Sequence, residues 1–142
     1  MKKMTRDECL AFLVARPRTG KLATVRPDGR PHVAPVWFDL DGDQIVFTTW
    51  QTTAKAANLR HSPWVSFCID DEAPPFAFVK IDGTAEFSND LAELRRWATR
   101  IAGRYMGDAL AETYGTRNAV PGELLVRVTP VSIIGQDDVA GW

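Results

Sequence analysis

The sequence feature that most constrains the fold is a series of strand-sized apolar runs separated by Asp-Gly turns. The runs 21–25, 32–38 and 45–49 are separated by the segments RPDGRP and DLDGDQ. An Asp-Gly pair between two such runs is typical of a tight hairpin, because both residues tolerate the positive φ angles that the turn requires. The sequence therefore predicts consecutive antiparallel hairpins in its first third.

Three further apolar runs extend the series. They cover residues 64–70, 76–87 and 124–128, and the last continues past Pro130 toward Ile134. Six antiparallel strands with only two or three helices must bury both a sheet face and the sheet edges, and closing the sheet into a small barrel does both. The sequence therefore predicts a mainly β fold, a six-stranded antiparallel β-barrel with flanking helices.

Two helices are indicated by their caps. Thr5-Arg6-Asp7-Glu8 is a capping box, and the helix that it starts should end near Arg16. Ser88-Asn89-Asp90 caps a second, longer helix. Its helically spaced apolar residues should face the core, and they are Leu91, Leu94, Ala98, Ile101 and Tyr105. Its arginines lie off that stripe and are expected to be solvated, and they are Arg95, Arg96, Arg100 and Arg104.

The size and charge of the chain limit its function. A chain of 142 residues is one ordinary domain, 1–142. Its 17 basic and 18 acidic residues nearly cancel, which argues against a general nucleic-acid binder and against a polybasic membrane protein. No window approaches the roughly 18 continuous apolar residues of a membrane span, and the start of the chain has no apolar leader. We therefore expect a cytoplasmic protein.

Cysteine and histidine are too few for a metal site of recognisable spacing. Cys9 and Cys68 lie in apolar patterns, so we expect reduced core residues. The two histidines, His32 and His61, have no serine, cysteine or carboxylate at a recognisable catalytic spacing. We expect neither a metal nor histidine-based catalysis.

The segment QTTAKAANLRHSP contains the most distinctive chemistry. Thr52 and Thr53 are natural N-caps for a short helix that carries Lys55 in its first turn. A helix start offers unpaired N–H donors and about half a positive charge, and the hydroxyls and the ammonium add donors at the same point. The pattern favours a phosphate-sized pocket, while an exposed lysine on an ordinary capped helix is the alternative. Arg60 lies about 140° around the helix from Lys55, so it suits an extended anionic tail instead.

The run 32–38 carries a proline at position 35. Proline removes one hydrogen-bond donor from a sheet and usually marks an edge strand or a bulge. The backbone of this run is therefore expected to face a ligand instead of a neighbouring strand.

These segments together bring out a family resemblance. The stretches GKLATVRPDGRPHVAPVWF, KAANLRHSPWVSFCID, FVKIDGTAEF and ELLVRVTP span most of the chain. They resemble the pyridoxamine 5′-phosphate oxidase-like flavin-binding split barrels, particularly the small single-domain branch that uses the deazaflavin coenzyme F420. The resemblance implies a split barrel that binds a flavin or a deazaflavin.

The resemblance also implies which residues bind the cofactor. Lys55 matches the family's phosphate-binding position, and Thr53 adds a hydroxyl at the same helix start. Asn58 and Arg60 belong to the family pattern KxxNLRxxP near the tail of the cofactor. The strand expected along the ring and the pair that ends the next strand comprise Val33, Ala34, Pro35, Val36, Trp37, Phe38, Thr48 and Thr49.

A homodimer with the cofactor between two barrels is a further implication of the resemblance. Phe76 and Phe78 are candidates to reach into the partner's site, with core packing as the alternative. The flavin-phosphate oxidases carry basic residues at the positions of Val33 and Phe38 and just before the phosphate lysine, where this chain has Ala54. This difference favours coenzyme F420 over FMN.

The preferred hypothesis is a coenzyme F420-dependent oxidoreductase that reduces a small conjugated organic molecule by hydride transfer at a homodimer interface. The absence of a catalytic histidine is compatible with it, because the cofactor carries the redox chemistry. The alternatives are an FMN-dependent oxidase or reductase of the same fold and a non-catalytic flavin-binding protein. A single-strand nucleic-acid module is disfavoured, because the sequence shows no basic groove.

Overall fold

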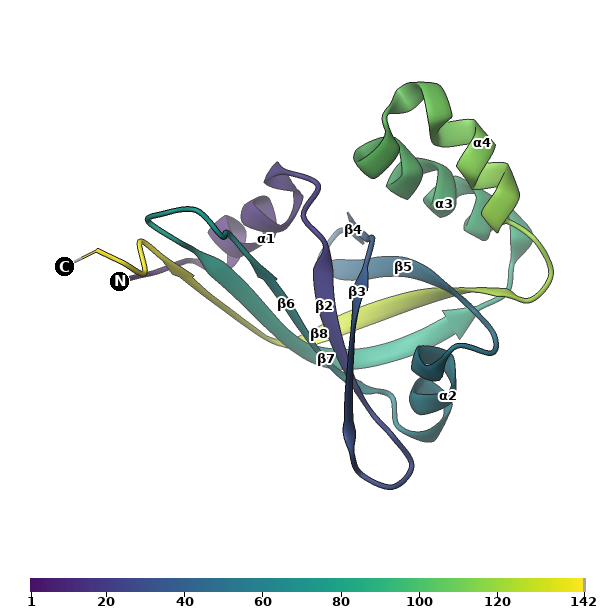
Figure 1. Ribbon diagram of the computed structural model, residues 1–142, viewed down its shortest axis with the longest axis horizontal. Helices are drawn as coiled ribbons and strands as arrows, with labels where there is room; N and C mark the ends of the chain where they lie inside the picture. The colour runs from purple at the N-terminus through teal and green to yellow at the C-terminus, as the bar shows by residue number, and fades with distance from the viewer. Residues whose placement is uncertain (142) are drawn as a thin grey trace.

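The computed structural model describes residues 1–141, in which an antiparallel sheet curls on itself and carries helices on its outside (Figure 1). The elements in chain order are β1 (Lys2–Lys3), α1 (Arg6–Ala15), β2 (Gly20–Val25), β3 (Pro31–Val36), β4 (Asp39–Asp41), β5 (Gln44–Trp50), α2 (Ala54–His61), β6 (Trp64–Asp70), β7 (Phe78–Ser88), α3 (Leu91–Met106), α4 (Asp108–Asn118) and β8 (Glu123–Asp137). The capping box of α1 and the helix that it starts are confirmed. Within the described residues, none of these helices is long and apolar enough to span a membrane.

The order of strands explains how the sheet closes. Neighbouring strands follow the order β3-β2-β6-β7-β8-β5-β4, and β1 pairs with the far part of β8. The two end strands, β3 and β4, are joined by Trp37 and Phe38 alone, so the ends of the sheet are held close together. The predicted antiparallel barrel with flanking helices is confirmed, and the short strands β1 and β4 are added to the six that were predicted. Since β3 lies at one end of the order, the edge position predicted from Pro35 is confirmed.

One predicted hairpin is wrong. The β2–β3 hairpin around Gly29 exists, but β3 does not pair with β5, and the second Asp-Gly turn joins the short strand β4 to β5 instead. The chain bends at Phe38, where side chains of α3 form hydrogen bonds with the backbone N–H and carbonyl groups. The Tyr105 hydroxyl accepts from the Phe38 N–H at 3.3 Å, and the Arg104 guanidinium donates to the Phe38 carbonyl.

The last two strands also differ from their predicted bounds. Phe76 has a φ of +63° and belongs to the turn before β7, so the strand begins two residues later than predicted. β8 continues through Pro130 to Asp137. Pro130 lies opposite Gly83, where the register of β7 and β8 shifts, and a bulge of this kind tolerates a residue without an N–H group.

Two clusters of apolar side chains form the core. The barrel interior includes Leu22, Phe38, Phe47, Phe67 and Ile81, with Cys9 and Leu13 of α1 and Leu59 of α2 packed against them. The second cluster lies between α3 and the outer face of β5 and β8, and comprises Val46, Leu94, Trp97 and Leu125. Cys9 is buried as predicted, whereas Cys68 is only half-buried, and burial raises the pKa of both thiols.

The helix α3 corrects two expectations. Leu94, Ala98 and Ile101 are buried as the stripe predicts, but Leu91 is exposed, while Trp97 and Ala102 are buried as well. Arg104 is not solvated: besides Phe38 it donates to the Arg16 carbonyl at 3.2 Å and to that of Leu13 at 3.5 Å. Its guanidinium therefore ties α3 to α1 and to the bend between β3 and β4.

The helix α4 was not predicted from the sequence. It follows α3 after Gly107, which adopts a φ of +90°, and the two helices form an antiparallel hairpin on one side of the sheet (Figure 1). Gly115 is the buried residue of α4, and a Cβ there would overlap the Thr99 side chain of α3. The close approach of the two helices therefore depends on this glycine.

Candidate functional site

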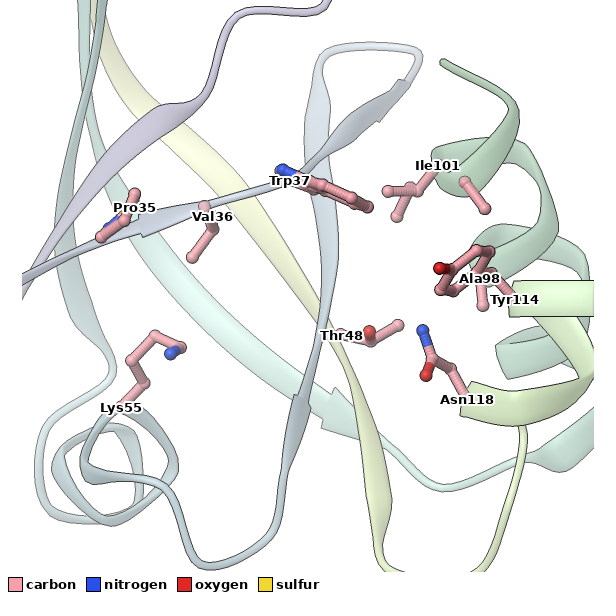
Figure 2. Close-up of a pocket in the computed structure, with 10 residues that line it drawn as sticks. Pro35, Val36, Trp37, Thr48, Lys55, Ala98, Ile101, Tyr114 and Asn118 are labelled. Atoms are coloured by element: carbon pink, nitrogen blue, oxygen red, sulfur yellow. The ribbon is translucent and has the colours of Figure 1, made fainter. Parts of the chain in front are cut away.

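A cavity of about 280 Å³ lies between β3, α2 and the α3–α4 hairpin (Figure 2). Its lining residues come from five elements and from the bend after β3, and they are Pro35, Val36, Trp37, Thr48, Lys55, Ala98, Ile101, Ala102, Tyr114 and Asn118. Figure 2 shows Lys55 on one side of the cavity and the α3–α4 residues on the opposite side, with Thr48 between them.

The α2 side of the cavity is a helix N-terminus. The Thr53 hydroxyl accepts the Ala56 N–H at 3.2 Å, so the predicted N-cap is confirmed. Lys55 is half-buried, and its side chain extends from α2 into the space below the strand that carries Pro35 and Val36 (Figure 2). A first-turn lysine and the positive end of the helix dipole act on the same space, which suits an anionic group.

The β3 side is apolar and flat. Pro35, Val36 and Trp37 present hydrocarbon surface to the cavity, without a cationic side chain among them. The indole of Trp37 stacks on the ring of Tyr105, with centroids 4.9 Å apart and planes 1° from parallel. The Tyr105 hydroxyl donates to the Arg18 carbonyl at 2.7 Å, so the stack is fixed to the barrel from behind. This surface has the shape needed to pack against a planar ring.

The floor of the cavity is the outer face of β5. Val46 and Thr48 share that face, because side chains alternate along a strand, and Val46 belongs to the cluster beneath α3. Thr48 pairs with Leu125 of β8, and Trp50 pairs with Glu123. Burial raises the pKa of Glu123, while the Thr48 hydroxyl and the Lys55 charge act in the opposite direction. Glu123 shares this outer face of the sheet, so its carboxyl group lies beside Thr48 on the same side as the cavity.

The α3–α4 side combines an apolar surface with two polar groups. Ala98, Ile101 and Ala102 of α3 face the cavity, while Tyr114 and Asn118 of α4 contribute a phenol and an amide. Sequence reasoning missed Tyr114, Asn118 and Glu123. Tyr114 and Asn118 are four residues apart, a spacing that places both on one face of a helix. The sequence does not show that this face lines a cavity with Thr48 of β5.

The structure gathers five of the predicted cofactor-binding residues around the cavity: Pro35, Val36, Trp37, Thr48 and Lys55. Other members of the predicted ring-binding strand lie elsewhere. Phe38 is fully buried in the barrel interior, Val33 is 67% exposed, and Ala34 is half-buried farther along β3. A ligand role for the side chain of Phe38 is excluded by its burial, so that residue can offer only its backbone, which α3 already occupies.

The remaining predicted residues lie around α2 and at the far end of the sheet. The hydroxyl oxygens of Thr49 and Thr53 lie 2.7 Å apart and form a hydrogen bond with each other. Asn58 is buried and donates to the Thr24 hydroxyl at 3.0 Å, which ties α2 to β2. Arg60 is exposed and donates to the Gln51 carbonyl at 2.8 Å, on a different face from Lys55. Phe78 is half-buried at the start of β7 and is not among the residues that line the cavity.

The cavity fits part of a flavin-type cofactor. Ligand pockets usually measure about 300–1,000 Å³, so a space of this size accommodates a ring system while a long tail must extend outside it. Val36 and Trp37 offer the packing surface for the ring, and Lys55 offers a cation for a phosphate. In the described part of the chain, no three histidine, cysteine or acidic side chains gather as a metal site would require.

Comparisons with known proteins agree with this arrangement. The family model described as pyridoxamine 5′-phosphate oxidase matches residues 5–137. A conserved hypothetical protein of Mycobacterium tuberculosis is similar, with 28% identity, a TM-score of 0.83, and coverage of 95% of this chain and 86% of that one. An F420 reductase is 27% identical, with a TM-score of 0.68 over 87% of this chain and 94% of that one. An FAD-binding protein of Mesorhizobium loti shares the fold at 21% identity, with a TM-score of 0.69 over 94% and 93% of the two chains.

Proposed function

Because the chain belongs to the pyridoxamine 5′-phosphate oxidase family, we propose that it is a coenzyme F420-dependent oxidoreductase that acts on a small conjugated organic substrate. The observation that carries the proposal is the pairing of a flat apolar surface, formed by Val36 and Trp37, with Lys55 at a helix start across the same cavity. The similarity to an F420 reductase supports it.

Each side of the cavity has a distinct task in this proposal. Lys55 and the free N–H groups of α2 hold the cofactor phosphate, and Trp37 packs against its ring. The α3–α4 residues cover the opposite side, where they exclude water and bind the substrate. When bound, the reduced cofactor supplies a hydride, and the protein contributes position, shielding and charge.

Coenzyme F420 suits the cavity better than FMN. A reduced flavin becomes anionic and benefits from positive charge near its ring, whereas Pro35, Val36 and Trp37 offer none. An FMN-dependent oxidase or reductase of the same fold remains the alternative. A non-catalytic flavin-binding protein is the other, and oxidation of pre-reduced cofactor by enones or quinones distinguishes turnover from storage.

A homodimer is part of the proposal. The outer face of the barrel carries a hollow of about 450 Å³ lined by Val25, Trp64 and Val131 among others, and Trp64 is 52% exposed. Phe78 does not line the cavity of its own chain, so in this proposal it serves the partner's site across such an interface. Sedimentation at roughly ten-micromolar concentration, which suits micromolar interfaces, should show a dimer. The cytoplasmic location expected from the sequence stays a prediction.

The direct test is the choice of cofactor. The protein should purify colourless from a host without the deazaflavin and should bind added coenzyme F420 at least ~10-fold more tightly than FMN, a difference of about 1.4 kcal/mol. Cofactor fluorescence titration measures both affinities. Isolation as a stoichiometric yellow FMN complex, without deazaflavin binding, would favour an FMN-dependent enzyme. Cofactor binding without turnover would favour a non-catalytic flavin-binding protein.

A further inference from the structure

The backbone of Glu123 is fixed by the turn that starts β8. Its N–H donates to the Val120 carbonyl at 3.1 Å, and the preceding residue, Gly122, accepts the Gln51 N–H at 2.9 Å. Gly122 has a φ of +99°, and the Trp50 ring packs where a Cβ would stand. The backbone that carries Glu123 is therefore fixed on both sides, by the turn and by its pairing with β5.

The strand register places Glu123 beside Thr48. Glu123 pairs with Trp50, and Leu125 pairs with Thr48, so all four side chains share the outer face of β5 and β8. Diagonal neighbours on one face of a sheet are within reach of long side chains. This register puts the Thr48 hydroxyl within reach of the Glu123 carboxyl group, where it lowers the pKa of Glu123. Thr48 lines the cavity and Glu123 does not, so Thr48 is the member of the pair that a ligand in the cavity can contact.

The charges around Glu123 come from two elements. Burial, the largest effect, raises the pKa of Glu123, whereas the positive charge of Lys55 on α2 lowers it. On its own strand, Arg127 lies on the same face but is held by Asp41 at 2.6 Å and by Glu93 at 2.8 Å. The cavity-lining residues of β5 and α4 carry no charge, and they are Thr48, Tyr114 and Asn118.

We propose that Glu123 and Thr48 form a proton relay that supplies the proton accompanying hydride transfer to the substrate. The proposal deepens the proposed function and rests on it. Thr48 is the group that touches the substrate, and Glu123 acts through it. A hydride alone leaves a reduced double bond with a negative charge, so a proton donor beside the cavity completes the reaction.

The relay balances for an enone such as 2-cyclohexen-1-one. The β-carbon gains a C–H bond from the hydride of the reduced cofactor, and the electron pair of the C=C bond moves toward the α-carbon. That carbon takes the Thr48 hydroxyl proton, and Thr48 takes the proton of the Glu123 carboxyl group. Glu123 is half-buried, so water can return a proton to it. The substrate is reduced by two electrons and the cofactor is oxidised.

Cofactor binding should prepare the relay. A phosphate on Lys55 neutralises the charge that favours ionised Glu123, so the pKa of the carboxyl group rises further when an anion is bound. Binding is then coupled to proton uptake. This coupling is measurable without turnover, by adding FMN or coenzyme F420 to the protein in weak buffer and recording the pH change.

The central experiment compares Glu123→Gln with the unaltered protein, using pre-reduced coenzyme F420 and 2-cyclohexen-1-one. The substitution should lower kcat about 10²-fold while cofactor affinity stays within about twofold. In the unaltered protein kcat should fall as pH rises through the pKa of Glu123, because the acid must be protonated, and Glu123→Gln should lose this dependence. Glu123→Asp should restore part of the rate.

The hydroxyl is tested by a matched pair at position 48. Thr48→Val keeps the shape and should reproduce the loss, whereas Thr48→Ser keeps the donor and should retain most of the rate. The phenol of Tyr114 is the competing donor, since it lines the same cavity. If Tyr114→Phe abolishes the pH dependence and Glu123→Gln does not, the relay is wrong.

A spectroscopic measurement separates this proposal from the proposed function. The side-chain carboxyl carbon of Glu123, followed by ¹³C NMR in the cofactor-free protein, should titrate above its ordinary value of 4.5 and higher again in Thr48→Val. An unshifted titration, or equal proton uptake by Glu123→Gln and the unaltered protein, would overturn the relay alone. Failure of the unaltered protein to bind either cofactor would overturn the proposed function.

Discussion

The two helical sides of the cavity are attached to the molecule in different ways. On one side, α2 buries Ala56, Asn58 and Leu59, and Leu59 belongs to the barrel core. On the other side, α4 lies on the outside of α3, away from most of the sheet (Figure 1), and its buried residue is Gly115. The side proposed to bind the phosphate is therefore part of the barrel, whereas the opposite side is attached to the molecule through one helix.

Under the proposed function, this difference separates the side that holds the cofactor from the side that meets the substrate. Segments with few buried apolar contacts open locally at low free energy, while segments in the main core open only with the whole domain. A cation that must hold a phosphate in one position benefits from α2, and a surface that must accept differently shaped substrates benefits from α4. We expect substitutions on the two sides to have separable effects.

The largest expected effect comes from removing the anchor of α2. Leu59→Ala deletes a side chain that is 6% exposed and should lower the free energy of unfolding by about 2–5 kcal/mol. Leu110→Ala is the matched control on α4, because Leu110 is 40% exposed, and it should change stability by less than about 0.5 kcal/mol. Urea denaturation measures both. Similar losses in the two variants would contradict the contrast between the helices.

The next effect concerns the ligand. Lys55→Ala should weaken cofactor binding roughly ten- to hundredfold, or about 1.5–3 kcal/mol, because a charge-assisted contact to the phosphate is lost. Arg117→Ala removes an equal charge from the exposed surface of α4 and should leave the affinity unchanged. Fluorescence titration with FMN and coenzyme F420 tests the pair. Equal affinities in Lys55→Ala and the unaltered protein would show that Lys55 does not bind the cofactor phosphate.

Locally encoded features of the α2 side could be predicted from the sequence. Thr53 caps the helix, and Lys55 follows two residues later, so their geometry depends on a single helical turn. The β2–β3 hairpin was predictable for the same reason, since Asp28 and Gly29 specify their own turn. These features need no information about distant parts of the chain.

Features that depend on distant residues could not be predicted. The bend at Phe38 is held by Arg104 and Tyr105, which follow it by 66 and 67 residues, and an arginine off an apolar stripe looks solvated until its partners are placed. Glu123 lies in the segment RNAVPGE, which has the composition of an ordinary loop. Its position beside Thr48 follows from the pairing of β8 with β5. Part of the site therefore arises from tertiary contacts alone.

A smaller effect should loosen α4 selectively. In Gly115→Ala the added Cβ would overlap the Thr99 side chain, so the two helices must separate, at a cost of about 1–3 kcal/mol. Gly103→Ala is the matched control on the same helix pair, because its Cβ would meet Ala111 at 3.6 Å, an ordinary contact. Amide exchange in α4 should accelerate about tenfold in Gly115→Ala, while exchange in α2 stays unchanged. Acceleration in both helices would show that the two sides are coupled.

The smallest effect tests how α3, which carries α4, is fixed to the sheet. Arg127 of β8 donates to the Glu93 carboxylate at 2.8 Å, and this bond is the main cause that lowers the pKa of Glu93 below its ordinary 4.5. A lowered pKa in the folded state contributes stability that is fully present above the ordinary value and disappears as the pH falls through the folded value. Glu93→Gln should therefore lower the free energy of unfolding by about 0.2–1 kcal/mol at pH 7, a range typical of partly exposed ion pairs.

The difference in unfolding free energy between this variant and the unaltered protein should shrink once the pH falls below 4.5. Urea denaturation across that range measures it, and a difference that stays constant with pH would show that the ion pair does not hold α3 in place.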